Sequence, residues 1–267
     1  MAEDNAPWHL HLQQSQDIRT GYAAMRGRLT PVTYQAVNGQ AIYEGDIILG
    51  STSDIDWITQ QVQSGGAPAA LLSGSLHDGL WPQGIVPYVI ESAPKKDLIL
   101  EAVRIWSENT AIKLIPAGNL AGAPAGVPVA RWPLVFVDGT VCSSHLGYQN
   151  RRQTVIVGAG CDLARVLHET GHAIGLFNEH TRPDRDEYIE VLHENIEEGM
   201  EFNFAINPAA DTLRPYDYAS IMHCGGFIFS KNGKPTLRAK KPDVSLNYGV
   251  KKTISAGDVA AVNALYR

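Results

Sequence analysis

The chain has 267 residues, a formal net charge of −6 and 44% hydrophobic residues, the composition of a globular protein with one or two domains. Its acidic balance, and the lack of a basic run with interleaved aromatic residues, argue against a nucleic-acid partner. The longest apolar stretches, such as residues 134–137, fall far short of the roughly 20 residues that cross a bilayer, so we expect no membrane span. The first residues lack the basic and then apolar pattern of a secretory signal, so the location has to be inferred from other features.

A stretch of small, flexible residues divides the chain into two parts. Residues 64–70 read Ser-Gly-Gly-Ala-Pro-Ala-Ala and residues 73–75 read Ser-Gly-Ser, which is typical of linkers that proteases cut. We therefore expect an N-terminal region at residues 1–71 and a main domain at residues 72–267. The N-terminal region has short apolar pieces around one turn signal at residues 44–46, and we expect it to be weakly ordered by itself.

Apolar and β-branched residues recur at regular spacing in six segments of the main domain. The spacing predicts strands at residues 85–90, 134–137 and 154–157, and helices at residues 96–110, 162–176 and 255–266. The second helix has a capping residue in Asp162 and a terminating glycine in Gly175. In the third helix, Ser255 and Asp258 have the spacing of a capping box. The three strands suit one sheet.

The helix predicted at residues 162–176 carries the motif His168-Glu169-Thr170-Gly171-His172. Two imidazoles at positions i and i+4 lie on one face of a helix, where both can bind one metal ion. Glu169 is rotated from that line by about 100 degrees, so it can reach a metal-bound water without being a ligand. Zinc lowers the pKa of such a water to about 7, and an adjacent carboxylate can take the proton and pass it to a leaving amine. The motif therefore predicts peptide hydrolysis, whereas a bare pair of histidines at this spacing is more often a surface pair.

The sequence after this motif decides between these interpretations. Residues 173–186 and the later Ser-Ile-Met-His at residues 220–223 resemble the astacin family of zinc endopeptidases, within the metzincin group. The resemblance covers residues 72–267, and it implies an α+β fold. It implies a twisted, mostly parallel mixed sheet with an antiparallel strand at the cleft, two long helices behind it, and a C-terminal subdomain with a methionine turn at Met222, preceded by a short prosegment.

The same resemblance implies a latent zinc protease. Zn2+ is the implied cofactor, with His168 and His172 as ligands and Glu169 as the catalytic base and acid. Residues 43–46, Tyr-Glu-Gly-Asp, are similar to the family's propeptide motif, whose aspartate occupies the open position of the metal. Asp46 is then the zymogen latch, residues 1–71 are the propeptide, and the activation bond lies between about residues 67 and 76. The implied partners are protein or peptide substrates and the chain's own propeptide.

Further roles are implied residue by residue. Cys142 and Cys161 fall where the family has a disulfide, which indicates an oxidising compartment and a secreted or extracellular protein, the alternative being two free buried thiols. Glu179 would receive the new N-terminus after activation, and the strand at residues 154–157 would border the cleft and pair with substrate. We expect a buried polar network at His180, Arg182, Asp184 and Asp186. We expect surface or hydrogen-bonded histidines at positions 9, 11, 77, 145 and 193.

Two positions depart from the family pattern. Asn178 replaces the third histidine ligand, and Cys224 replaces the tyrosine that follows the methionine turn. An amide oxygen is a weaker zinc ligand than imidazole, and a thiol is a poor hydrogen-bond donor to an oxyanion.

Three interpretations of these departures stay open. The substitutions were introduced to silence a working protease, or the protein is a natural non-catalytic relative that binds peptides or a partner in its cleft. In the third interpretation Cys224 joins His168 and His172 as a ligand, and Asp46 or water completes the shell. His180 fits the family pattern as a non-ligand.

Overall fold

The computed structural model describes residues 15–65, 79–92, 94–119, 129–246, 251 and 253–267. The N-terminal part contains strands β1 (Ile18–Met25), β2 (Arg28–Val37), β3 (Gln40–Tyr43) and β4 (Ile47–Ser51) and helix α1 (Thr52–Gln63). The main domain contains strands β5 (Ile85–Ile90), β6 (Lys113–Pro116), β7 (Leu134–Gly139), β8 (Cys142–His145), β9 (Gln153–Gly158), β10 (Ile189–Val191) and β11 (Leu237–Ala239), and helices α3 (Lys96–Asn109), α4 (Leu163–Ala173) and α5 (Ala256–Leu265). All six elements predicted for the main domain are confirmed to within a few residues.

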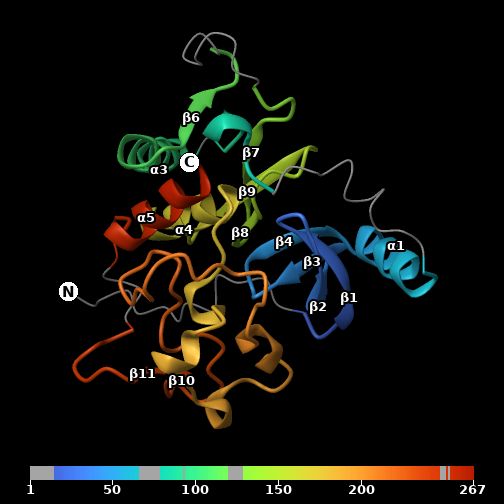
Figure 1. The fold of residues 1–267 in the computed structure, drawn as a ribbon, viewed down its shortest axis with the longest axis vertical. Coiled ribbons are helices and arrows are strands. Elements are labelled where there is room, and N and C mark those ends of the chain that lie inside the picture. Colours follow the sequence, from blue (N-terminus) through green and yellow to red (C-terminus); the bar gives the residue numbers. More distant parts are fainter. Residues whose placement is uncertain (1–14, 66–78, 93, 120–128, 247–250, 252) are drawn as a thin grey trace.

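One nine-stranded sheet runs through both parts of the chain, in the order β1-β2-β3-β4-β8-β9-β7-β5-β6 (Figure 1). Strands β5, β6, β7 and β9 are parallel, and β8 is antiparallel to β9. The predicted α+β fold is confirmed, and among the main domain's own strands of this sheet three pairings are parallel and β8 is the antiparallel strand at one side. Strands β10 and β11 form a separate two-stranded sheet in the C-terminal part.

The prediction that residues 154–157 border the cleft is wrong. These residues belong to β9, which lies between β7 and β8, whereas β8 is the last strand of the main domain on that side. The β-branched run of β9 is typical of a strand with neighbours on both sides. The sequence of β8, Cys-Ser-Ser-His, is short and polar, so its strand conformation comes from pairing with its neighbours rather than from local preference.

The N-terminal part pairs with β8 and continues the sheet beyond the main domain. Strand β4 pairs parallel with β8, with Ile47 opposite Ser144 and Ile48 opposite His145. Strands β1 to β4 form an antiparallel meander, and helix α1 packs against it. Its apolar cluster includes Tyr34, Ile47 and Ile55 together with Leu146 and Phe177 of the main domain. The sequence predicted none of these four strands.

The position of helix α4 is fixed by its two ends and by its packing against helix α3. The Asp162 side chain accepts a hydrogen bond from the Arg165 N–H, as predicted for a helix cap, and Gly175 ends the segment with a positive φ of 103°. Helices α3 and α4 pack against each other, and the Trp106 indole donates to the Leu167 carbonyl at 3.0 Å. The large core between the sheet and these helices therefore sets the position of the histidine-bearing helix.

A disulfide joins Cys142, at the start of β8, to Cys161, just before α4. This pairing confirms the prediction for these two cysteines and excludes the alternative of two free thiols. The disulfide links β8 to the segment just before α4, the helix that carries the two histidines. Among the described residues, no helix has the length and apolar character needed to cross a bilayer.

Candidate metal centre

The two histidines of α4 face the same point. His168 and His172 are fully buried, and their ring centroids are 4.6 Å apart. The Nδ1 atom of His168 lies 2.8 Å from the Ile221 carbonyl, and that of His172 lies 2.8 Å from the Leu176 carbonyl. Because a carbonyl only accepts, both Nδ1 atoms carry the proton. In the neutral imidazoles, both Nε2 atoms then present a lone pair, as metal ligands do.

A carboxylate of the N-terminal part meets these lone pairs. Asp46 Oδ2 lies 3.2 Å from His168 Nε2, and Asp46 Oδ1 lies 3.4 Å from His172 Nε2. The Ser144 N–H of β8 donates to the Asp46 carbonyl at 2.9 Å, so the β4–β8 pairing holds this residue in place. Burial raises the pKa of Asp46, whereas positive charge at His172 and His168 lowers it below its usual range. The carboxylate is ionised when a proton or a metal ion lies between it and the imidazoles.

These three residues fit a zinc ion. Within the described chain, the metal-binding cluster that forms consists of Asp46, His168 and His172, whose ligand atoms lie within 4.8 Å of one another. Tetrahedral zinc ligands at about 2.0–2.1 Å from the ion are about 3.3–3.4 Å apart, close to the observed separations. Nitrogen and carboxylate oxygen atoms at these separations attract one another only through a proton or a metal ion between them.

Glu169 has the environment of a proton acceptor beside this cluster. It is fully buried, and neither of its carboxylate oxygens has a hydrogen-bond partner among the described residues. Burial raises the pKa of Glu169 well above its ordinary value, and the Asp46 charge adds to this shift. An unpaired buried carboxylate is costly, which indicates that a bound group compensates it.

Met222 packs against helix α4 between the two histidines. A Cβ atom added at Gly171, in the turn of α4 between the two histidines, would collide with the Met222 sulfur, so glycine allows this contact. Ser220 and Ile221 bind the Asp258 carboxylate at the start of α5, where the predicted capping box of Ser255 and Asp258 is present. The segment at residues 220–223 is thus held between two helices.

Asn178 lies at the cluster, but its amide nitrogen faces carboxylates. Its Nδ2 donates to Glu44 Oε2 at 2.9 Å and lies 3.3 Å from Asp46 Oδ1. Its Oδ1 lies 3.6 Å from the sulfur of Cys224, a free and fully buried cysteine. Burial raises the pKa of the Cys224 thiol well above its ordinary value. The two departures from the family pattern therefore contact each other, and Cys224 is not part of the three-residue cluster.

The N-terminal part contributes a second buried carboxylate, Glu44, which sequence analysis missed. Its Oε2 accepts from Asn178 and lies 3.2 Å from the Thr181 hydroxyl, and its Oε1 accepts from Asn207 Nδ2 at 3.0 Å. Burial raises the pKa of Glu44 to about 7. The only signal in the sequence was its place two residues before Asp46, at a position where the family motif takes any residue.

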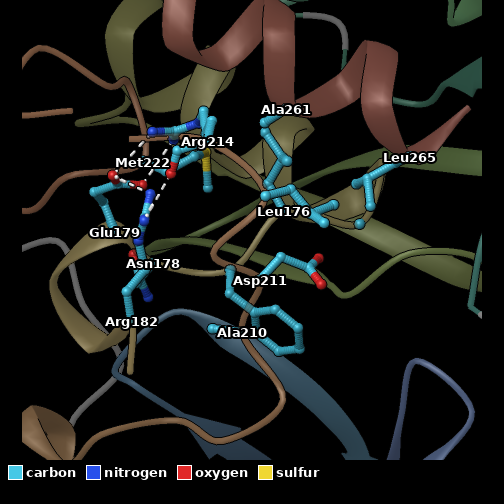
Figure 2. Close-up of a pocket in the computed structure, with 13 residues that line it drawn as sticks. Leu176, Asn178, Glu179, Arg182, Ala210, Asp211, Arg214, Met222, Ala261 and Leu265 are labelled. Carbon is cyan, nitrogen blue, oxygen red and sulfur yellow. Dashed lines mark hydrogen bonds and ion pairs between the residues drawn. The ribbon is translucent and has the colours of Figure 1, made fainter. Parts of the chain in front are cut away.

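Glu179 lies beside a cavity lined by Leu176 and Leu265 (Figure 2). Arg214 binds both of its carboxylate oxygens at 2.9 and 2.7 Å, and Arg182 donates to Oε1 at 3.0 Å. The backbone N–H of Asp217 donates to the same oxygen at 2.8 Å. Oε1 therefore accepts three of these hydrogen bonds and Oε2 one, and Arg214 is a partner that the sequence did not indicate.

The predicted polar network is buried except at one end. Arg182 binds both Glu179 and Asp184, and His180 lies in the interior near the Asn203 carbonyl. The prediction that Asp186 is buried is wrong, because its side chain is 65% exposed, although it forms an ion pair with Arg185. Of the other histidines, His145 is buried and accepts from the Thr154 N–H, and His193 is at the surface. Positions 9, 11 and 77 lie outside the described residues.

Comparisons with known proteins agree with this geometry. The sequence model of the Astacin peptidase family matches residues 75–267. Blastula protease 10 of Paracentrotus lividus is 37% identical over 193 residues, covering 70% of this chain and 32% of that protein. Zinc metalloproteinase nas-14 of Caenorhabditis elegans is 30% identical over 280 residues, covering 96% of this chain and 53% of that protein.

A solved structure shows the same fold. High choriolytic enzyme 1, a hatching enzyme zinc-protease from Oryzias latipes, superposes with a TM-score of 0.58 and 29% identity, covering 71% of this chain and 90% of that one. The chain therefore belongs to the astacin family of zinc metalloproteases, whose cofactor is Zn2+. It spans only about a third to a half of the length of the two curated relatives described here.

Proposed function

We propose that this chain is the latent form of a zinc-dependent endopeptidase that hydrolyses peptide bonds of proteins or peptides. Residues 1–71 are its propeptide and residues 72–267 its protease domain. The observation that carries the proposal is the Asp46 carboxylate, which lies 3.2 and 3.4 Å from the Nε2 atoms of His168 and His172. A carboxylate at this place occupies the position that a water or a substrate carbonyl needs. The activation bond, proposed between residues 67 and 76, lies outside the described residues.

The residues of the site then have distinct roles. His168 and His172 hold the ion, and Zn2+ when bound polarises the scissile carbonyl and acidifies a water. Glu169 accepts the proton at its unpaired carboxylate and returns it to the leaving nitrogen. Once β4 leaves, the edge of β8 offers backbone N–H and C=O groups to an extended substrate.

Glu179 remains our proposed partner for the new N-terminus after activation. Its carboxylate already binds Arg214 through two hydrogen bonds, so a terminal ammonium has to replace or join that arginine. The disulfide between Cys142 and Cys161 supports a secreted or extracellular location, because such bonds persist in oxidising compartments.

A second candidate is a non-catalytic relative that binds peptides or a partner in the same cleft. The observation that favours it is Asn178, which turns its amide N–H toward carboxylates instead of presenting an imidazole to the metal. The two candidates share the fold, the metal and the cleft, and they differ in whether bound peptide is cut.

Limited proteolysis followed by a casein assay separates them. We expect the untreated full-length chain to be inactive, and we expect casein cleavage to appear after the prosegment is cut and to vanish with a chelator. Glu169→Gln is the matched control, because it keeps the ligands and removes the proton acceptor. Peptide binding without any cleavage after complete removal of the prosegment would support the non-catalytic candidate instead.

A further inference from the structure

Glu44 and Asp46 come from one tight turn that packs against the main domain. Glu44 has a positive φ of 54°, which residues with a Cβ rarely adopt, and Gly45 follows with a φ of 91°. These two left-handed residues send both carboxylates toward the main domain. Glu44 is 2% exposed and Asp46 is fully buried. A strained turn that buries two carboxylates persists only where the surrounding structure holds it.

The two carboxylates are held in chemically different ways. Asp46 lies 3.2 and 3.4 Å from the Nε2 atoms of His168 and His172, at the place where a metal ion would be bound. Glu44 accepts from the neutral amides of Asn178 and Asn207, and these hydrogen bonds need no metal.

Both amides are oriented by their other contacts. The Oδ1 atom of Asn207 accepts from the Ala209 N–H at 2.9 Å, which leaves its Nδ2 pointing at Glu44. The Oδ1 atom of Asn178 faces the Cys224 thiol, which leaves its Nδ2 for the same carboxylate. Asn178 and Asn207 are fully buried, so water does not replace these bonds. The receiving site is therefore preorganised.

We propose that Glu44, bound by Asn178 and Asn207, anchors the N-terminal part in the cleft whether or not a metal is present. Asn178 then serves this anchor, which gives a physical role to the residue at the third-ligand position. The inference rests on the proposed function only for the identification of residues 1–71 as a prosegment. Glu44 is a positioning residue in this account, since it acts by holding Asp46 in place.

Hydrogen exchange of the full-length chain tests the anchor without any enzymatic assay. The Ser144 N–H donates to the Asp46 carbonyl, so its protection reports directly whether the turn is docked. Exchange is measured by mass spectrometry in zinc and in chelator. We expect the wild-type Ser144 amide to stay protected in chelator, and Glu44→Gln to speed its exchange about tenfold or more, because a donor replaces one acceptor.

Two further variants complete the design. Asn207→Asp keeps an oxygen that accepts from the Ala209 N–H, but it places a second oxygen next to the Glu44 carboxylate. We therefore expect it to speed exchange of the Ser144 amide as Glu44→Gln does, although the change lies in the main domain. Asp56→Asn, at an exposed carboxylate of the same part, is the matched control and leaves protection unchanged. Amides of β7 report global unfolding and are expected to stay protected throughout.

The possible results test the Glu44 anchor and the proposed protease activity independently. If wild-type Ser144 loses protection in chelator, or if neither Glu44→Gln nor Asn207→Asp changes its exchange there, the anchor is overturned while the Asp46 latch stands. If the variants open the turn but the chain binds no zinc and never cleaves casein, the anchor stands and the proposed protease fails.

Discussion

We propose that Asn178 and Cys224, at the positions where the family pattern has histidine and tyrosine, leave this chain with a weaker zinc site. The amide and the thiol contact each other, with Sγ 3.6 Å from Oδ1, so each fills space beside the other at the cluster. We expect Asn178→His with Cys224→Tyr to tighten zinc binding and to raise casein cleavage after prosegment removal by about tenfold or more.

The double variant carries its own control. Adding Glu169→Gln to it is expected to preserve zinc binding and abolish cleavage, since only the proton acceptor is lost. Equal casein cleavage by the double variant and the wild-type chain would contradict our account of these positions and favour the non-catalytic candidate.

His145 makes stability depend on pH in mild acid. Burial lowers the pKa of His145 to about 4, whereas an exposed histidine in the unfolded chain titrates near 6.5. Between these values the unfolded state binds more protons, so the free energy of unfolding falls as the pH falls. Relative to His145→Asn, which keeps an acceptor for the Thr154 N–H, the wild type should lose about 2 kcal/mol between pH 7.5 and 5.

Urea denaturation at the two pH values measures this difference, and the comparison cancels the contribution of the other buried histidines. Parallel pH dependence in the wild type and His145→Asn would show that His145 is not the cause.

At the scale of single elements, helix α4 depends on a glycine between its two histidines. A Cβ at Gly171 would collide with the Met222 sulfur, so we expect Gly171→Ala to destabilise the fold by about 1–3 kcal/mol through overpacking. This expectation opposes helix propensity, which favours alanine by up to about 1 kcal/mol. Chemical denaturation measures the net effect.

Gly118→Ala is the matched control, because nothing lies within 4 Å of a Cβ there. It is expected to leave the free energy of unfolding within about 0.5 kcal/mol of the wild type. A stabilising effect of Gly171→Ala would contradict the packing of Met222 against this helix.

The elements that could be predicted from sequence are those with strong local signals. Helix α4 has a cap, an apolar stripe and a terminating glycine, and α5 has a capping box that the structure contains. Strand β8 and the meander β1 to β4 lack such signals, because their stability comes from pairing and from a cluster shared with the main domain. Local periodicity carries no information about those contacts.

Within the site, too, local features could be predicted from the sequence and long-range contacts could not. The spacing of His168 and His172 is a property of one helix, so their shared face could be predicted. The contact of Glu44 with Asn178 joins residues 134 positions apart, and Arg214 meets Glu179 across 35 positions. No local pattern predicts such pairs, and the family motif did not specify the residue at position 44.

At the scale of the whole molecule, the N-terminal part and the main domain share one sheet and one metal-binding cluster. Strand β4 continues the sheet at β8, and the turn just before β4 delivers Asp46 to the histidines of α4 (Figure 1). Because a ligand that binds only the folded state stabilises it, zinc should raise the melting temperature of the entire chain.

The central claim is that Asp46, His168 and His172 hold a zinc ion, and metal content tests it most directly. We would measure zinc per chain by plasma mass spectrometry on full-length protein purified without added metal, beside His168→Ala. The account predicts about one equivalent in the wild type and almost none in the variant. A wild-type chain without zinc, or a variant that keeps it, would contradict the account.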